Sequence, residues 1–270
     1  MSVSGSNFKL SKWYLDCINS EGEAIIIYAA KITYNKLVIP YNSVIYSFNG
    51  NKFFHKSRFR KLSFPEITSS KIIFKDKKHE IYGQWESETP GISQEIFKSE
   101  NGIAHWNCHH PKANAVVEFN NTSRINGLGY VEHISLTIEP WNIPMRQLKW
   151  GRFISSEAYI VWIEMKNDPL QQWLWYNGKL LPNCTITNDA ILINEKNAEL
   201  VFSRKIIIES EKKVSNLVKS LVEFIPGLRK KMTSSFLYAD ETKWLSKGTL
   251  KCAGQTKSNG WVIHEFVNFE

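Results

Sequence analysis

The chain has 270 residues, of which 43% are hydrophobic, and a formal net charge of +8. This length suits one large or two modest domains, and the hydrophobic content is ample for a core. The sequence has no run of about 18 apolar residues, which argues against a membrane-spanning helix. The first residues, Met1–Lys9, lack the apolar region of a secretory signal, so we expect a cytoplasmic protein.

The positive charge is scattered along the chain, and its densest groups, Lys56–Lys61 and Arg229–Lys231, are short. Such groups are typical of solvated loops or helix ends, so we expect no nucleic-acid partner. The cysteines are far apart and form no Cys-x-x-Cys pair, which predicts four reduced thiols: Cys17, Cys108, Cys184 and Cys252.

The N-terminal half reads as β-structure. Apolar residues occupy both alternating faces of Glu23–Tyr34, which predicts a strand that is partly buried on both sides. Asn49-Gly50 then signals a hairpin turn. The predicted strands are Lys12–Asp16, Glu23–Tyr34, Lys36–Phe48, Lys71–Phe74, His79–Trp85 and Ala113–Phe119.

The C-terminal half is also strand-rich. Asn-Gly pairs recur at Asn101, Asn126, Asn177 and Asn259, and repeated hairpin signals between short alternating runs favour a barrel or sandwich. The exception is Lys212–Ile225, whose apolar spacing of three and four predicts one amphipathic helix. The predicted strands are Glu157–Lys166, Gln171–Tyr176, Lys179–Leu181, Ala190–Asn194, Glu199–Ile208, Ser234–Tyr238, Lys247–Cys252 and Trp261–Phe269.

The central stretch Gly127–Phe153 contains an unusual acid. With a period of two, Tyr130 and Glu132 share a strand face with Ile134, Leu136 and Ile138. A carboxylate on an apolar face is unfavourable unless it is paired, protonated or functional. We expect Glu132 to point into an apolar interior, where burial would raise its pKa and leave a proton to donate.

Two prolines, Pro140 and Pro144, follow this strand and interrupt regular structure. They place the predicted domain boundary, with one domain at 1–140 and the other at 141–270.

The segment His105–Pro111 holds three of the seven histidines and a thiol. A metal site would need these ligands on one face, but Pro111 follows at once and no second cluster supplies a fourth ligand, so we expect no metal. The remaining interpretations are a loop or strand end with polar histidines, and a pocket lined by His105 and Trp106.

The final strand repeats the pattern of the central one, because Glu265 shares a face with apolar residues and His264 lies on the other face. The alternative to a functional role is a salt bridge from Glu265 to a lysine or an arginine such as Arg152. Arg152 itself could anchor an anionic group of a substrate or pair with Glu132.

Tyr130-Val-Glu132 after Gly127-x-Gly129 resembles the Gly-x-Gly-Tyr-x-Asp motif of the carotenoid 1,2-hydratase (hydroxyneurosporene synthase) and AttH-type lipocalin-like superfamily. The His105–Pro111 segment and the closing Gly260-Trp-Val-Ile-His-Glu run are similar to segments of that family. The resemblance implies an all-β fold of two tandem lipocalin-like, calycin-type β-barrel domains, here with one short helix in the second half.

The resemblance also implies roles for residues. Glu132 takes the place of the family acid, Tyr130 that of its tyrosine, and His105 and Trp106 those of its upstream residues. This chain departs from the pattern in three ways: Glu replaces Asp, His133-Ile134-Ser135 replaces Asn-Trp-Gly, and His105 and Trp106 are adjacent.

We therefore expect a cofactor-independent enzyme that hydrates or cyclises an apolar terpenoid- or polyene-like molecule. Its catalytic residues would be Glu132, Tyr130 and His105. The alternative is a non-catalytic carrier of an apolar small molecule. Both interpretations allow transient contact with a membrane. The candidate substrate-binding residues are Trp106, His133, Arg152, His264 and Glu265.

Overall fold

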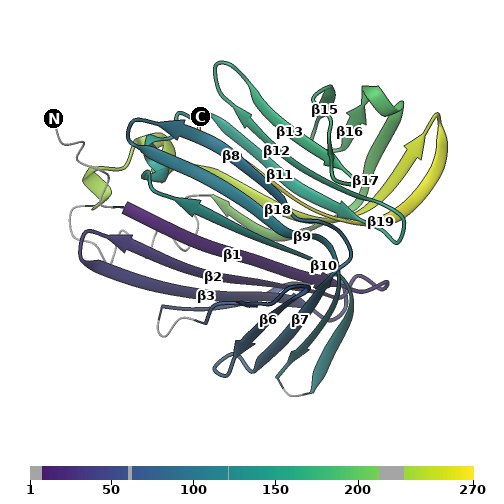
Figure 1. The fold of residues 1–270 in the computed structure, drawn as a ribbon, viewed down its shortest axis with the longest axis horizontal. Coiled ribbons are helices and arrows are strands. Elements are labelled where there is room, and N and C mark those ends of the chain that lie inside the picture. Colours follow the sequence, from purple (N-terminus) through teal and green to yellow (C-terminus); the bar gives the residue numbers. More distant parts are fainter. Residues whose placement is uncertain (1–7, 60–62, 121, 213–227) are drawn as a thin grey trace. The chain divides into compact units, whose positions relative to one another are not determined.

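The computed structural model describes residues 8–59, 63–120, 122–212 and 228–270 (Figure 1). The chain forms two compact units, Met1–Ile143 and Pro144–Glu270, each built on one antiparallel β-sheet. The predicted fold class, all-β with two lipocalin-like halves, is confirmed.

Unit 1 contains a ten-stranded sheet in the order β4-β3-β2-β1-β10-β9-β7-β6-β5, with β8 also paired to β9. The inner strands form where apolar residues alternate or run continuously along the sequence. β2 is buried on both faces, as predicted for Glu23–Tyr34. The strands are β1 (Phe8–Ile18), β2 (Ala24–Tyr34), β3 (Leu37–Ser47), β4 (Phe54–Arg58), β5 (Glu66–Ile67), β6 (Lys71–Asp76), β7 (Ile81–Ser87), β8 (Ile92–Ser99), β9 (Gly102–Phe119) and β10 (Ser123–Leu136).

Unit 2 contains a nine-stranded sheet in the order β14-β13-β12-β11-β19-β18-β17-β16-β15. The Asn177-Gly178 turn joins β13 to β14, as predicted. The strands are β11 (Gln147–Ile154), β12 (Tyr159–Lys166), β13 (Gln171–Tyr176), β14 (Lys179–Leu180), β15 (Cys184–Ile186), β16 (Ala190–Ile193), β17 (Ala198–Lys212), β18 (Asp240–Cys252) and β19 (Gln255–Asn268).

The two sheets share one topology. In each unit the first strand pairs with the last, so β1 lies beside β10 and β11 beside β19, with a four-stranded meander on one side (Figure 1). The pairing register is also equivalent, because Ile18 pairs with Leu128 at the end of β1 and Ile154 pairs with Trp261 at the end of β11. The chain therefore contains a structural repeat that its sequence does not reveal.

Each unit has its own apolar core on one face of its sheet. In unit 1 this core includes Leu15, Ile27, Trp85 and Val131. In unit 2 it includes Phe153, Trp162, Leu200 and Val262. Both cores form because large apolar side chains at alternate strand positions point to the same face of the sheet.

Two of the predicted Asn-Gly turns are wrong. Asn126-Gly127 lies within β10, and Asn259-Gly260 lies within β19. A Cβ atom on Gly127 would lie 2.0 Å from the carbonyl oxygen of Ile18, and one on Gly260 would lie 2.2 Å from that of Ile154. These glycines therefore permit a close approach of two strands rather than a turn.

Three further predictions need correction. Residues Phe54–Arg58, at the start of the basic group expected to be a loop or helix end, form the edge strand β4. The segment Ser234–Leu237 is a short helix, α2, because the Thr233 hydroxyl caps it by accepting from the Phe236 amide. Of the predicted helix, Lys212 ends β17 and the rest lies outside the described residues.

The remaining described elements are three 3₁₀ turns, at Pro140–Asn142, Asn194–Lys196 and Leu228–Lys230. No helix in the described ranges has the length and hydropathy needed to cross a membrane. The four cysteines are free thiols, as predicted; Cys17 and Cys108 are buried, whereas Cys184 and Cys252 are partly exposed.

Candidate functional site

The acid of the central strand is held by two buried donors. Trp106 Nε1 donates to Glu132 Oε2 at 2.5 Å, and the Tyr130 hydroxyl donates to the same oxygen at 2.6 Å. Tyr130 is 0% exposed and Trp106 is 2% exposed, whereas Glu132 retains partial exposure. Glu132 is therefore the partly exposed member of a hydrogen-bonded network whose two donors are buried.

Strand periodicity and pairing register build this arrangement. Tyr130 and Glu132 share one face of β10 because they are two residues apart. On β9, Cys108 lies opposite Glu132, and Trp106 lies opposite Ile134. Trp106 is therefore a diagonal neighbour of Glu132, within reach of its long indole side chain.

The candidate acid does not point into the barrel core, which corrects the sequence expectation. Core residues of unit 1 such as Leu15 and Val131 alternate with Tyr14 and Glu132 along the paired strands β1 and β10. Glu132 thus lies on the opposite face of the sheet from the apolar core, and it is partly exposed.

Burial holds the neighbours of Glu132 in their protonated forms. The pKa of Tyr130 is raised well above its usual value, mainly by burial and then by the charges of Cys108 and Glu132. Burial also raises the pKa of Cys108 well above its usual value, although a hydrogen bond with Tyr130 opposes this shift. At neutral pH Tyr130 is therefore a phenol that donates to Glu132.

Sequence reasoning missed Tyr14 and Asp16, which lie on the same face of the sheet as Tyr130 and Glu132. The Tyr14 hydroxyl donates to Asp16 Oδ2 at 3.0 Å, and Asp16 is completely buried. The available signal was the Tyr14-Leu15-Asp16 sequence, which has the same tyrosine-to-acid spacing as Tyr130 and Glu132.

His105 and His133 lie on the other face of the sheet, away from Glu132. The His133 ring lies 4.6 Å from that of Trp13 in the unit 1 core, and Ser11 Oγ lies 2.8 Å from His133 Nε2. His105 Nδ1 lies 3.0 Å from the side-chain amide of Asn107. The structure therefore separates His105 from the acid that it was expected to orient.

This histidine segment is part of a strand, not a loop or strand end. His105 to His110 lie inside the long strand β9, and a bulge shifts the β9–β10 register near His110. Burial lowers the pKa of His133 to about 4, with contributions from His109 and His105. The His133 imidazole is therefore neutral at physiological pH.

The remaining predicted site residues lie in unit 2. Arg152 on β11 is buried and donates to the Trp261 carbonyl at 3.0 Å. His264 is buried and stacks on Trp244 with ring centroids 4.9 Å apart. Burial lowers the pKa of His264 to about 3, so that this ring is also neutral.

Glu265 forms a salt bridge, in agreement with the structural alternative considered for it. The Lys243 ammonium, 4% exposed, lies 2.6 Å from the Glu265 carboxylate. In unit 1, Glu132 pairs with Tyr14, which precedes the strand-end residue Ile18 by four positions. In unit 2, Glu265 pairs with Trp150, which precedes the strand-end residue Ile154 by the same four positions. The two acids therefore occupy equivalent positions in the repeat, but only Glu265 has a lysine directly opposite on the neighbouring strand.

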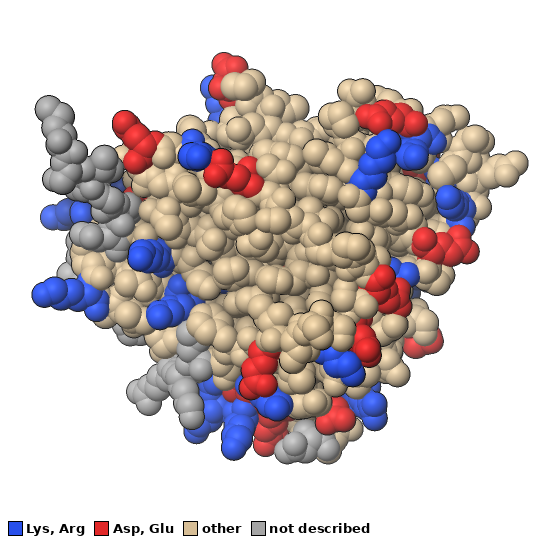
Figure 2. Space-filling view, viewed as in Figure 1, with Lys and Arg blue, Asp and Glu red and all other residues tan. Residues whose placement is uncertain are grey.

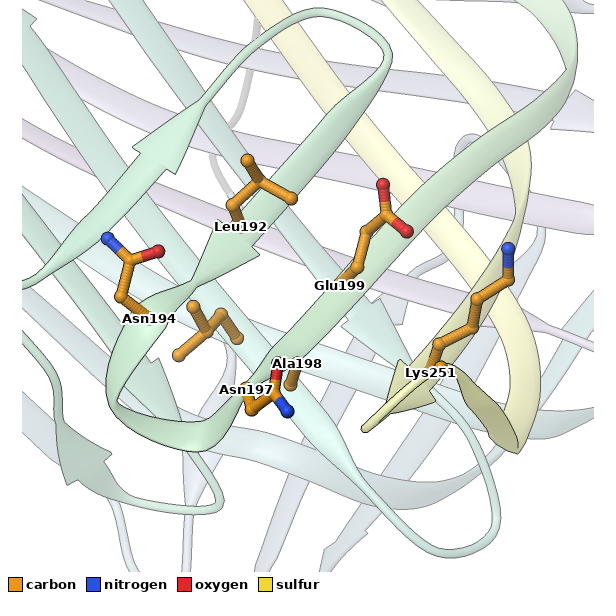
Figure 3. A pocket seen from close by; sticks show the side chains of 8 residues that line it. Leu192, Asn194, Asn197, Ala198, Glu199 and Lys251 are labelled. Carbon is orange, nitrogen blue, oxygen red and sulfur yellow. The ribbon is translucent and has the colours of Figure 1, made fainter.

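Within the described ranges, no three His, Cys, Asp or Glu side chains lie close enough together to hold a metal ion. One cavity of about 380 Å³ lies in unit 2, at the turns that join β16 to β17 and β18 to β19 (Figure 3). Its lining includes Leu192, Glu199 and Lys251 but none of the residues predicted to form the site.

No family model matches the sequence, and no curated protein matches it. Several solved structures resemble the fold over nearly the whole chain. CghA, in its structure with Sch210972, is 9% identical, with a TM-score of 0.61 over 97% of this chain and 89% of that chain. An AttH-like protein from Nitrosomonas europaea is 8% identical, with a TM-score of 0.55 over 96% and 92%.

Kievitone hydratase from Nectria haematococca is 9% identical, with a TM-score of 0.54 over 99% of this chain and 92% of that chain. At these identities the similarity establishes the fold. It confirms the AttH-type lipocalin-like architecture that the sequence resemblance implied.

Proposed function

We propose that this protein is a cofactor-independent enzyme that hydrates or cyclises a hydrophobic alkene-containing small molecule, with Glu132 as the group that transfers the proton. The observation that carries the proposal is the Glu132 carboxyl, partly exposed and held by the buried Trp106 and Tyr130 donors. A group fixed in this way is oriented before substrate arrives, and preorganisation is a large part of catalytic power.

The proposed chemistry begins with a protonated Glu132. Transfer of this proton to an alkene carbon leaves a carbocation and a carboxylate, and the Trp106 and Tyr130 donors stabilise that carboxylate as its charge develops. Addition of water with loss of a proton completes hydration, whereas attack by a second alkene followed by proton loss to the carboxylate completes cyclisation.

The structural neighbours and the surface charge agree with this proposal. One neighbour is named as a hydratase, and another was solved with Sch210972. Figure 2 shows that Lys and Arg side chains of the described residues are interspersed with Asp and Glu on the visible face. A contiguous basic surface of the kind that binds nucleic acid is therefore not seen on that face.

The test uses purified protein and a panel of isoprenoid and polyene alkenes in deuterium oxide. In this solvent hydration adds D and OD across the alkene, and one carbon-bound deuterium remains after the hydroxyl exchanges with ordinary water. Acid-assisted cyclisation adds no oxygen and gives a ring product that carries one deuterium. We expect Glu132→Gln to lower turnover by about 100-fold or more, as is typical for loss of a general acid.

Glu265→Gln is the matched control, because it removes the carboxylate at the equivalent position of the repeat. We expect this variant to retain turnover, although loss of the Lys243 salt bridge should lower its melting temperature. Binding of an alkene without conversion, equal in wild type and Glu132→Gln, would show that the protein is a carrier.

A further inference from the structure

Two tyrosine–carboxylate pairs lie side by side on neighbouring antiparallel strands. On β10 the Tyr130 hydroxyl donates to Glu132, and on β1 the Tyr14 hydroxyl donates to Asp16 at 3.0 Å. Tyr14 is directly opposite Glu132, and Asp16 is directly opposite Tyr130. The rings of Tyr14 and Tyr130 meet edge to face, with centroids 5.9 Å apart. The two acids are therefore diagonal neighbours, with Cβ atoms roughly 7–8 Å apart or less.

The side chains around Glu132 and Asp16 show that the two acids share an electrostatic environment. Cys108 on β9 is opposite Glu132 and interacts with Tyr130. Its pKa is raised mainly by burial and further by electrostatic interaction with both Glu132 and Asp16. On the other side, Tyr28 of β2 contacts the Tyr14 ring, and the Lys12 ammonium lies 4.9 Å above the Tyr28 ring. Asp16 has no exposed surface, and the Tyr14 hydroxyl donates to it, which favours its ionised form. Water therefore screens a charge on Asp16 only weakly from these neighbours.

We propose that Asp16 is a positioning residue of the Glu132 site, whose negative charge increases the affinity of Glu132 for its proton. The proposal rests on the proposed function, in which Glu132 is the proton donor. It addresses a specific difficulty of that function: the hydrogen bonds from Trp106 and Tyr130 favour the ionised carboxylate. A second anion on the same face opposes this preference, so that Glu132 can both hold and release a proton.

The test measures the protonation of Glu132 without any substrate. Infrared spectra are recorded across a pH series, and the protonated carboxyl band of Glu132 is identified by its loss in Glu132→Gln. In Asp16→Asn, we expect the midpoint of this band to move to lower pH by roughly one unit, a tenfold loss of proton affinity. Glu118→Gln, which neutralises an exposed carboxylate on β9, is the control and should leave the midpoint unchanged.

Tyr14→Phe provides a second variant in case Asp16→Asn does not fold. It removes a donor that stabilises ionised Asp16, so we expect a smaller shift in the same direction. An unchanged Glu132 midpoint in a folded Asp16→Asn, or in Tyr14→Phe if the first variant does not fold, would overturn the proposal.

The outcomes also separate this proposal from the proposed function. If Glu132→Gln abolishes turnover but Asp16→Asn leaves the midpoint unchanged, the enzyme assignment stands and the role of Asp16 is rejected. If the midpoint moves but no alkene is converted, the coupling stands and the enzyme assignment is rejected. A merely structural Asp16 would change the melting temperature but not the midpoint.

Discussion

Gly127 and Gly260 mark equivalent positions where the last strand of each unit crosses the end of the first. The nearest atom to a Cβ at either position is a main-chain carbonyl oxygen, of Ile18 or of Ile154. A backbone atom in a paired strand cannot rotate away as a side chain can. At these two positions the residue type is therefore dictated by the packing of the backbone.

We accordingly expect Gly127→Ala to destabilise the protein by about 3 kcal/mol or more, the upper end of overpacking effects. Gly254→Ala is the control, because its Cβ would meet open space and only its positive φ of +80° opposes the change. That backbone strain is worth about 1–2 kcal/mol. Urea unfolding of the two variants measures the difference, and equal losses would contradict the argument.

At the scale of elements, the sheet of unit 1 is joined across the barrel by side chains. The path of paired strands, as far as it is described, ends at β4 and β5. Asp76 on β6 accepts two hydrogen bonds from Arg58 on β4, at 2.7 and 2.8 Å, and one from Asn42 on β3 at 3.3 Å. His79 Nδ1 lies 3.0 Å from the same carboxylate. This network links β3 and β4, at one end of the described path, to β6, which is next to the other end.

Removing the Asp76 charge should therefore destabilise unit 1 by weakening the contact of β3 and β4 with β6. We expect Asp76→Asn to cost about 3 kcal/mol, because it leaves the guanidinium of Arg58 without its buried carboxylate partner. Thermal unfolding measures this loss, and hydrogen exchange should locate the added opening in β3, β4 and β6. Glu95→Gln, in an exposed pair with Lys98, is the control and should have little effect.

At the scale of the whole molecule, both units contain histidines that the surrounding protein keeps neutral. The pKa of His133 is lowered to about 4 in unit 1, and that of His264 to about 3 in unit 2; burial is the main cause of both shifts. Burial also lowers the pKa values of His109 and His110. A buried imidazole that resists protonation makes the folded state sensitive to acid.

These lowered pKa values make the folded protein less stable as the pH falls. Since the folded pKa lies below the ordinary value of about 6.5, the unfolded chain binds more protons as the pH falls. The full contribution of these histidines to stability is present above about pH 6.5 and is lost progressively toward pH 4. We expect the melting temperature to fall steadily from pH 7 to pH 4.5.

His264→Phe tests the cause of this acid sensitivity. It keeps the aromatic packing against Trp244 and Phe202 but removes the titratable group. The fall in melting temperature between pH 7 and pH 4.5 should be smaller in this variant than in the wild type, whatever its stability at pH 7. A fall of the same size would assign the acid sensitivity to other groups.

The sequence by itself determined which residues form most strands and which residues share a face. Tyr130 and Glu132 lie together for this reason, because alternation along one strand is a local property. The same reasoning placed Glu265 among apolar residues and provided a salt bridge as its alternative role. Glycine, in contrast, was ambiguous: Asn-Gly is a turn at Asn177 but lies within a strand at Asn126 and Asn259.

Only the tertiary structure decided which side chains from different strands meet. His105 and Trp106 are adjacent in sequence and equally plausible partners of Glu132, yet the β9–β10 register brings Trp106 to the acid and sends His105 to the other face. The same pairing of strands distant in sequence brings Asp16 beside Tyr130. Local patterns fix the face of a residue, whereas its partners depend on register, which is set by the packing of the whole sheet.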